Sequence, residues 1–210
     1  MSHFIVYYIK ALIFMKKEIF MIEVYTGNGK GKTTAAIGLA IRALGAGHRV
    51  YLMQFMKSLA YSEQKILAGF APALTLETTG KPFFIAEEGM LTDEERAAWG
   101  DDVVVFPKGK PPADYCALLA NGLSAAARAA ASGGYDLVIL DEINVALFFG
   151  LVSRSSLESL LDALPEKTEL VCTGRNAPDW LIARADLVTE MKEIRHYYAK
   201  GVPARKGIEN

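Results

Sequence analysis

From about residue 20 onwards, short apolar runs rich in β-branched residues alternate with stretches of helical periodicity. This alternation is typical of βαβ units, in which helices cover a largely parallel sheet. We expect strands near residues 20–26, 49–55, 73–79, 135–140, 168–173 and 186–190. We expect helices at about residues 32–45, 62–69, 92–99, 113–132, 155–164 and 178–184. The sequence therefore predicts a three-layer α/β/α fold with a mostly parallel central sheet.

A glycine-rich segment, TGNGKGKTT at residues 26–34, separates the first expected strand from the first expected helix. A strand, a glycine loop and a helix in this order are typical of a phosphate-binding P-loop. The glycines let backbone N–H groups turn inward, and the helix N-terminus adds a partial positive charge at the same point. The P-loop template has glycine at position 26, where this chain has threonine, but Gly27 stands next to it. We therefore expect a P-loop NTPase-like fold in which Lys32 contacts the outer phosphates.

A second motif, YDLVILDE at residues 135–142, is an apolar strand that ends in two carboxylates. Downstream of a P-loop, such a strand is typical of a Walker B motif, whose carboxylate reaches Mg²⁺ directly or through water. An acidic helix start is the alternative interpretation. We expect Mg²⁺, or Mn²⁺ in its place, to be held by the Thr33 hydroxyl and by one of the two carboxylates, Asp141 or Glu142.

With 210 residues, 51% of them hydrophobic, the chain has enough apolar material for one domain, which we place at residues 21–210. Lys and Arg total 23 against 24 Asp and Glu, so there is no overall positive field, and we expect no nucleic-acid partner. Cys116 and Cys172 lie in apolar surroundings. We interpret them as reduced core thiols of a cytoplasmic protein.

Residues 1–20 form an N-terminal extension whose apolar run, residues 4–14, is interrupted by Lys10. The run is shorter than the roughly 20 residues of a membrane helix, and basic residues follow it rather than precede it as in a signal peptide. We therefore expect no membrane span. Two interpretations stay open: a start-site artefact ahead of a natural start at Met15 or Met21, or an amphipathic flap over the domain.

The stretch from about residue 80 to 112 is the least regular part of the chain and holds several glycines and prolines. We expect a long loop region with one short helix there, acting as a lid or substrate-binding segment. Two expected helix starts match the capping box, Thr92 with Glu95 and Ser155 with Glu158.

The wider pattern, from about residue 22 to 209, resembles the ATP:corrinoid adenosyltransferases of the CobA type. The resemblance rests first on YTGNGKGKTTAA at residues 25–36, where threonine at position 26 is what that family shows. Further motifs agree in the same order: QF at 54–55, LVILDEI at 137–143, TGR at 173–175, ADLVTEM at 185–191 and GVPARKGIE at 201–209.

This resemblance implies that the chain transfers the 5′-deoxyadenosyl group of ATP to the Co(I) of a corrinoid, in adenosylcobalamin biosynthesis or salvage, and releases inorganic triphosphate. Co(I) is itself a strong nucleophile, so the reaction needs no protein base. The resemblance also implies a corrinoid substrate, a flavoprotein or other reductant that supplies Co(I), and a homodimer.

By the same resemblance, the triphosphate is held by Thr26, Gly27, Asn28, Gly29, Lys30, Gly31, Lys32, Thr33 and Thr34. Arg175 adds a fixed cation and acts with Lys32 on the leaving triphosphate; the alternative is a surface arginine in a turn. Phe83 is expected in a mobile loop over the corrinoid, where Ile85 stands in place of a second aromatic residue. For His196, a metal-ligand role is weighed against ordinary hydrogen bonding.

Two other classes of function use the same phosphate cradle, the segment of residues 26–34. A P-loop ATPase or small-molecule kinase would release ADP instead of triphosphate. A non-catalytic ATP-binding partner module would bind ATP without turnover. The identity of the product distinguishes these hypotheses.

Overall fold

The structure is a computed structural model and describes residues 21–209. The expected N-terminal extension, residues 1–20, lies outside the described residues. Among the residues that are described, no helix combines the length and the apolar character needed to cross a bilayer.

Within residues 21–209, six strands form the central sheet, and all the neighbouring strands run parallel. They are β1 (Ile22–Thr26), β2 (Val50–Phe55), β3 (Leu74–Thr79), β6 (Leu137–Asp141), β7 (Glu169–Thr173) and β8 (Leu187–Glu190). Their order across the sheet is β3-β2-β6-β7-β1-β8. The strands expected from the sequence are therefore confirmed at the predicted places.

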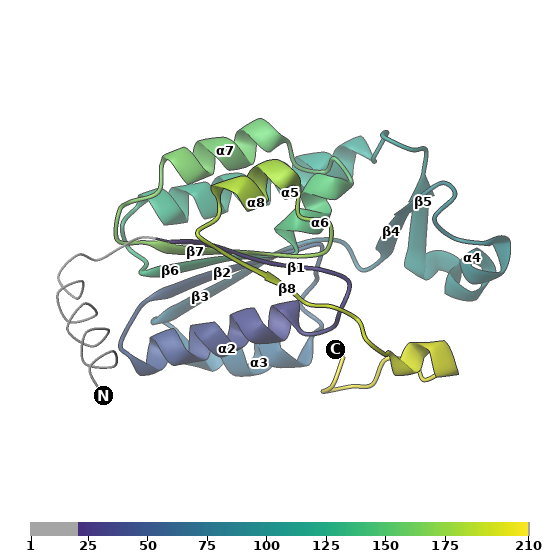
Figure 1. Ribbon diagram of the computed structural model, residues 1–210, viewed down its shortest axis with the longest axis horizontal. Helices are drawn as coiled ribbons and strands as arrows, with labels where there is room; N and C mark the ends of the chain where they lie inside the picture. Colours follow the sequence, from purple (N-terminus) through teal and green to yellow (C-terminus); the bar gives the residue numbers. More distant parts are fainter. Residues whose placement is uncertain (1–20, 210) are drawn as a thin grey trace, which may run out of the picture.

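Helices cover both faces of this sheet (Figure 1). One face carries α2 (Lys32–Gly45) and α3 (Ser62–Leu67). The other face carries α5 (Ala113–Ala131), α6 (Ile143–Phe148), α7 (Arg154–Asp162) and α8 (Asp179–Arg184). Since a glycine loop also links β1 directly to α2, the P-loop NTPase-like, three-layer α/β/α fold is confirmed.

Strand β2, which lies between β3 and β6, shows why the sheet needs a helix layer on each face. All six of its residues are buried. Val50 and Leu52 pack with Ala36 of α2 in one hydrophobic cluster, whereas Tyr51 and Met53 belong to the other cluster. Successive side chains of a strand point to opposite faces. A strand whose side chains are buried on both faces therefore has to be covered on both sides.

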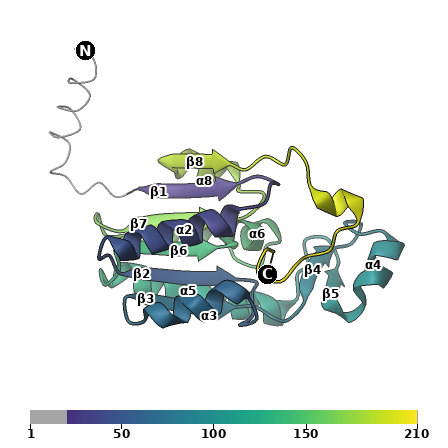
Figure 2. The same ribbon diagram turned by 90° about the horizontal axis from the view of Figure 1, so that it is seen from below.

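Residues 80–112 contain a second, two-stranded parallel sheet, so the prediction of a long loop is wrong. In this part of the described chain, β4 (Phe84–Glu87) and β5 (Val103–Phe106) are joined by α4 (Asp93–Trp99), the short helix that was expected. Figure 2 shows this β4–α4–β5 unit projecting beyond the end of the central sheet. Each strand has only four residues and lies close to glycine or proline. Such flanks suppress the usual strand signal.

Of the two predicted capping boxes, one is confirmed and one is wrong. Thr92 caps α4, because its hydroxyl accepts a hydrogen bond from the Glu95 N–H at 3.1 Å. The cap of α7 is Ser153 rather than Ser155, because the Ser153 hydroxyl accepts from the Ser156 N–H at 3.1 Å. Serine is a good N-cap at any of these neighbouring positions, so the pattern alone could not select one.

Both cysteines carry free thiols, with Cys172 fully buried in β7 and Cys116 half-buried on α5. Burial raises the pKa of the Cys172 thiol to about 12. Cys172 is therefore confirmed as a core residue, whereas Cys116 is only partly buried against the core.

Candidate active site

The glycine loop, residues 27–31, lies against the segment that follows β8. Gly27 has a φ of 90° and Gly31 a φ of 117°, in the left-handed region that favours glycine. A Cβ atom on Gly27 would lie 2.5 Å from the carbonyl oxygen of Met191. The Gly29 N–H donates to this same oxygen at 2.7 Å. The glycines therefore permit a close approach, and the amide of Gly29 is used to hold the loop in place.

Lys32, the first residue of α2, folds its side chain back onto the loop. Its ammonium donates to the carbonyl oxygens of Gly27 and Gly29, at 2.7 Å in each case. Burial lowers the pKa of Lys32; the Glu142 carboxylate opposes this shift, and the Arg175 guanidinium reinforces it. The ammonium is thus held inside the loop, where the outer phosphates of a bound nucleotide are expected.

Asp141, the last residue of β6, is the centre of a buried polar cluster beside the loop. One carboxylate oxygen, Oδ1, accepts from the hydroxyls of Thr33 at 2.9 Å and Thr173 at 2.7 Å. The other oxygen, Oδ2, accepts from Gln54 Nε2 at 3.1 Å and Lys57 Nζ at 2.9 Å. The cluster joins the carboxyl ends of β2, β6 and β7 to the start of α2. Ligands of open α/β sheets bind at this edge.

The Thr33 hydroxyl and the Asp141 carboxylate are oxygen donors of the kind that Mg²⁺ takes in proteins. The ion is usually held by one or two carboxylates and completes its shell with water and substrate phosphates. Within residues 21–209, no group of three or more His, Cys, Asp or Glu side chains could hold a metal ion. The Thr33 hydroxyl and the Asp141 carboxylate, 2.9 Å apart, fit a metal ion that takes its other ligands from water and nucleotide phosphates.

Glu142, the other expected metal ligand, has an unusual backbone conformation. Its φ is 64° and its ψ is 15°, and α6, a helix that the sequence did not indicate, begins directly after it. Its N–H donates to the Thr173 hydroxyl at 3.0 Å. Burial raises the pKa of the Glu142 carboxyl and Asp141 adds to the rise, whereas nearby cations, Lys57 first among them, lower it. Left-handed backbone in a residue other than glycine is strained, and such strain clusters at functional sites.

Arg175 is exposed on the turn that follows β7. The turn is sharp, since Gly174 has a φ of 130° and Asn176 a φ of 57°. A Cβ atom on Gly174 would lie 3.0 Å from the Cβ of Asn144, so glycine lets the turn pack against α6. The Arg175 guanidinium lies close enough to Lys32 to lower its pKa. Both expected catalytic cations therefore stand at the same edge of the sheet.

The remaining residues of the cradle differ in their surroundings. Thr26 is buried, and its hydroxyl accepts from the Ala177 N–H at 3.2 Å. This bond ties the loop to the turn after β7, so Thr26 supports the cradle from behind. Exposed side chains along the loop and the start of α2 belong to Asn28, Lys30 and Thr34.

A family model described as ATP:corrinoid adenosyltransferase BtuR/CobO/CobP matches residues 18–210. The chain belongs to this family. It is therefore a transferase of the corrinoid adenosyltransferase class, and ATP is the nucleotide substrate of the family.

Individual relatives agree with this assignment over most of the chain. A corrinoid adenosyltransferase of Pseudomonas aeruginosa is 31% identical over 192 residues, which cover 90% of this chain and 83% of that protein. The corrinoid adenosyltransferase CobA of Salmonella typhimurium is 31% identical over 196 residues, 92% of this chain and 87% of that protein. An uncharacterized protein of Nostoc sp., all2391, is 35% identical over 189 residues, 83% of this chain but 44% of that protein. The predicted resemblance is confirmed.

In this adenosyltransferase, Ile85 does not lie in a mobile loop as predicted. It is a β4 residue, only 9% exposed, and belongs to the main core. Phe83 directly precedes β4 and packs edge-on against Tyr115 of α5, with ring centroids 5.7 Å apart. The exposed aromatic residues of the unit are Phe84 and Trp99, whose ring centroids are 4.9 Å apart. Because the prediction missed β4, it also missed the alternation that turns Phe84 outward and Ile85 inward.

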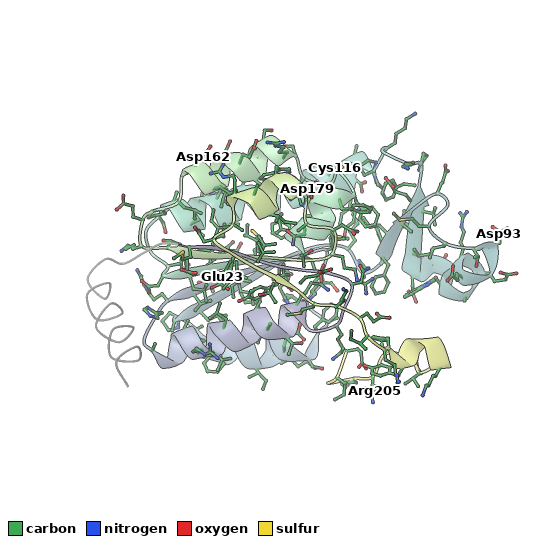
Figure 3. The ribbon with its side chains drawn as sticks, viewed as in Figure 1. Glu23, Asp93, Cys116, Asp162, Asp179 and Arg205 are labelled. Atoms are coloured by element: carbon green, nitrogen blue, oxygen red, sulfur yellow. The ribbon has the colours of Figure 1, made fainter. Side chains whose placement is uncertain are left out.

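The C-terminal tail of the adenosyltransferase returns to the phosphate loop. Lys30 donates to the Ile208 carbonyl oxygen at 2.9 Å, and Glu209 accepts from the Arg205 backbone N–H at 2.7 Å and from the Tyr197 hydroxyl. Figure 3 shows Arg205 on this tail, away from the central sheet. The His196 ring also lies in the tail, and among the described residues it belongs to no group of candidate metal ligands.

Proposed function

We propose that the enzyme transfers the 5′-deoxyadenosyl group of ATP to the Co(I) centre of a corrinoid and releases inorganic triphosphate. The reaction would serve adenosylcobalamin biosynthesis or salvage. The proposal is carried by the Asp141 cluster, in which Thr33 of the P-loop meets the ends of three neighbouring strands in a member of the corrinoid adenosyltransferase family. Since the cobalt is the nucleophile, the protein has to bind the leaving triphosphate and neutralise its charge.

In this proposal the triphosphate lies along residues 26–34, and Lys32 and Arg175 are the catalytic cations. Negative charge grows on the triphosphate as its bond to the ribose 5′ carbon breaks. Cations that bind this group more tightly in the transition state than in the ground state accelerate the reaction. Lys32 is already held inside the loop by two carbonyl oxygens, so little reorganisation is needed when a phosphate oxygen replaces one of them.

Mg²⁺, or Mn²⁺, would be held by Thr33 together with Asp141 and Glu142. The bound ion supplies further positive charge to the triphosphate. The hydrogen bonds from Thr173 and Gln54 keep the Asp141 carboxylate oriented toward the loop. A carboxylate fixed in this way loses little conformational freedom when it takes a ligand.

The corrinoid would lie beside the β4–α4–β5 unit, with Phe83 among its contacts. This unit projects beyond the edge of the sheet where the phosphate loop lies, which suits it to cover a second substrate (Figure 2). Because Co(I) has to be supplied, the proposal includes a flavoprotein or another reductant as partner. It also includes a homodimer and a cytoplasmic location.

Incubation of the protein with ATP, Mg²⁺ and chemically reduced cobalamin or cobinamide tests the proposal. The expected result is the light-sensitive spectrum of a cobalt–carbon bond, with inorganic triphosphate formed in equal amount. ADP released without any corrinoid would favour an ATPase or kinase. ATP binding with no turnover on either reduced corrinoid would favour a non-catalytic binding module.

A further inference from the structure

Lys57 is a largely buried cation to which the proposed mechanism gives no role. It follows β2, and its side chain is 12% exposed. Its ammonium lies 2.9 Å from Asp141 Oδ2, 3.9 Å from a Glu63 carboxylate oxygen and 5.1 Å from the centre of the Tyr61 ring. Carboxylates and the face of an aromatic ring both attract cations. The surroundings of Lys57 are therefore suited to a positive charge beside the phosphate loop.

The backbone around Lys57 is fixed by its neighbours. Met56 has a φ of 57°, and its N–H donates to the Thr79 carbonyl oxygen at 2.7 Å. A Cβ atom on Gly80 would lie 2.4 Å from the backbone nitrogen of Lys57, so glycine is needed for this approach. Because the backbone is held on both sides, the ammonium can change partner only by rotation of its own side chain.

The charges around the loop indicate what Lys57 adds. Lys32 and Arg175 stand near the carboxylates of Asp141 and Glu142, so the formal charges of these four residues cancel. A triphosphate carries several negative charges, and a single Mg²⁺ neutralises only part of them. Lys57 adds a further positive charge to this set, and its ammonium lies closer to Asp141, at 2.9 Å, than to Glu63, at 3.9 Å.

We propose that Lys57 is a further triphosphate-binding residue, which pairs with Asp141 while the site lacks nucleotide. When a metal ion that carries the phosphates binds to Asp141 Oδ2, the Lys57 ammonium leaves this oxygen and donates to a phosphate oxygen instead. The movement follows from the low exposure of the ammonium, because a side chain only 12% exposed that loses its hydrogen-bonded carboxylate is strongly unfavourable unless it gains another anion, and the Glu63 carboxylate, 3.9 Å away, lies beyond hydrogen-bonding distance. The inference rests on the proposed roles of residues 26–34 and Asp141 in binding triphosphate and metal.

Calorimetric titration of the full chain with inorganic tripolyphosphate, with and without Mg²⁺, tests this proposal. Lys57→Met removes the charge, and Lys65→Met makes the same change at an exposed position of α3. With saturating Mg²⁺, Lys57→Met should weaken binding at least about tenfold, whereas Lys65→Met should leave it within about twofold of the native chain. Without Mg²⁺ the effect of Lys57→Met should be clearly smaller, because the ammonium then stays on Asp141.

Two results would overturn the proposal. One is unchanged affinity of Lys57→Met for tripolyphosphate in the presence of Mg²⁺. The other is an equal loss of affinity with and without the metal ion, which is the behaviour of an ion pair that only maintains the fold.

A second measurement uses the native chain and does not depend on whether the variant folds. In a crystal structure with Mg²⁺ and tripolyphosphate, Lys57 Nζ within hydrogen-bonding distance of a phosphate oxygen supports the proposal, and Nζ still bound to Asp141 Oδ2 contradicts it. Neither measurement uses a corrinoid. Lys57-dependent binding without adenosyl transfer would therefore refute the proposed function alone, and adenosyl transfer with unaltered binding in Lys57→Met would refute this inference alone.

Discussion

At the residue scale, Lys32 both shapes the loop and stands where the leaving triphosphate is expected. Lys32→Ala should lower kcat/KM at least about tenfold, because a charge-assisted contact to phosphate contributes roughly 1.5–3 kcal/mol. Lys65→Ala, at an exposed site on α3, is the matched control and should keep near-native activity. Steady-state kinetics on both variants provide the measurement. Near-native turnover of Lys32→Ala would contradict a role of the phosphate cradle in catalysis.

The close packing of the glycine loop leads to a second prediction at this scale. Gly27→Ala should weaken ATP binding and lower the melting temperature, because its Cβ would lie 2.5 Å from the Met191 carbonyl oxygen on a backbone with a φ of 90°. Gly38→Ala is the control: no atom lies within 4 Å of its Cβ. This change inside α2 should raise stability by up to about 1 kcal/mol. ATP titration and thermal unfolding check both variants; native behaviour of Gly27→Ala would contradict the described contact.

The phosphate loop and Asp141 could be predicted because each belongs to a short motif with fixed spacing. The role of Lys57 could not be predicted, although its ammonium lies 2.9 Å from an Asp141 carboxylate oxygen, the same distance as the Thr33 hydroxyl. Nothing in the residues around it along the chain indicates that its side chain is buried, and its partner lies far away in the sequence. Contacts of this kind become visible only when the strands are brought side by side.

At the scale of elements, the position of Ile85 in β4 leads to a test of the β4–α4–β5 unit. Ile85→Trp should destabilise the fold by about 1–3 kcal/mol, because a larger ring overpacks a filled core. Phe84→Ala, at the exposed neighbouring position, should cost less stability since it loses mainly the contact with Trp99. Urea denaturation compares the two. A fully stable Ile85→Trp would mean that this side chain can leave the core.

The pairing of β1 with β7 makes stability sensitive to pH. Burial raises the pKa of Glu169 in β7 from 4.5 to about 7, and the carboxylate of Glu23 in β1 adds to the rise. Since the folded-state pKa lies above the unfolded one, this carboxyl stabilises the fold at low pH, and the contribution is lost as the pH rises through about 7. The native melting temperature should therefore fall more between about pH 5 and about pH 8 than that of Glu169→Gln. Parallel pH profiles would refute the assignment.

Most elements could be predicted from the sequence, including the short helices α3, α4 and α8, whereas β4, β5 and α6 could not. In the strands of the central sheet and in α5, the hydrophobic periodicity continues long enough to be recognised. By contrast, α6 has six residues and starts directly after β6, because the left-handed backbone of Glu142 turns the chain without any loop. A helix that begins in this way has none of the usual start signals.

At the scale of the whole molecule, deletion of residues 1–20 should leave a folded protein that binds ATP. The reason is that the central sheet begins with Ile22 of β1 and the whole cradle follows it. Circular dichroism, thermal unfolding and ATP titration check this. Retained turnover would favour a start-site artefact, and a folded, ATP-binding but inactive chain would favour the flap. Loss of the folded state would contradict the prediction.

The order of the strands has a consequence for the synthesis of this protein. Strand β1, which leads into the phosphate loop, is made first among the described strands, yet its neighbours in the sheet, β7 and β8, are made late. Pairings this distant in sequence form slowly. A chain that stops before β7 on the ribosome would leave β1 without partners and expose apolar surface, which marks it for chaperones and proteases.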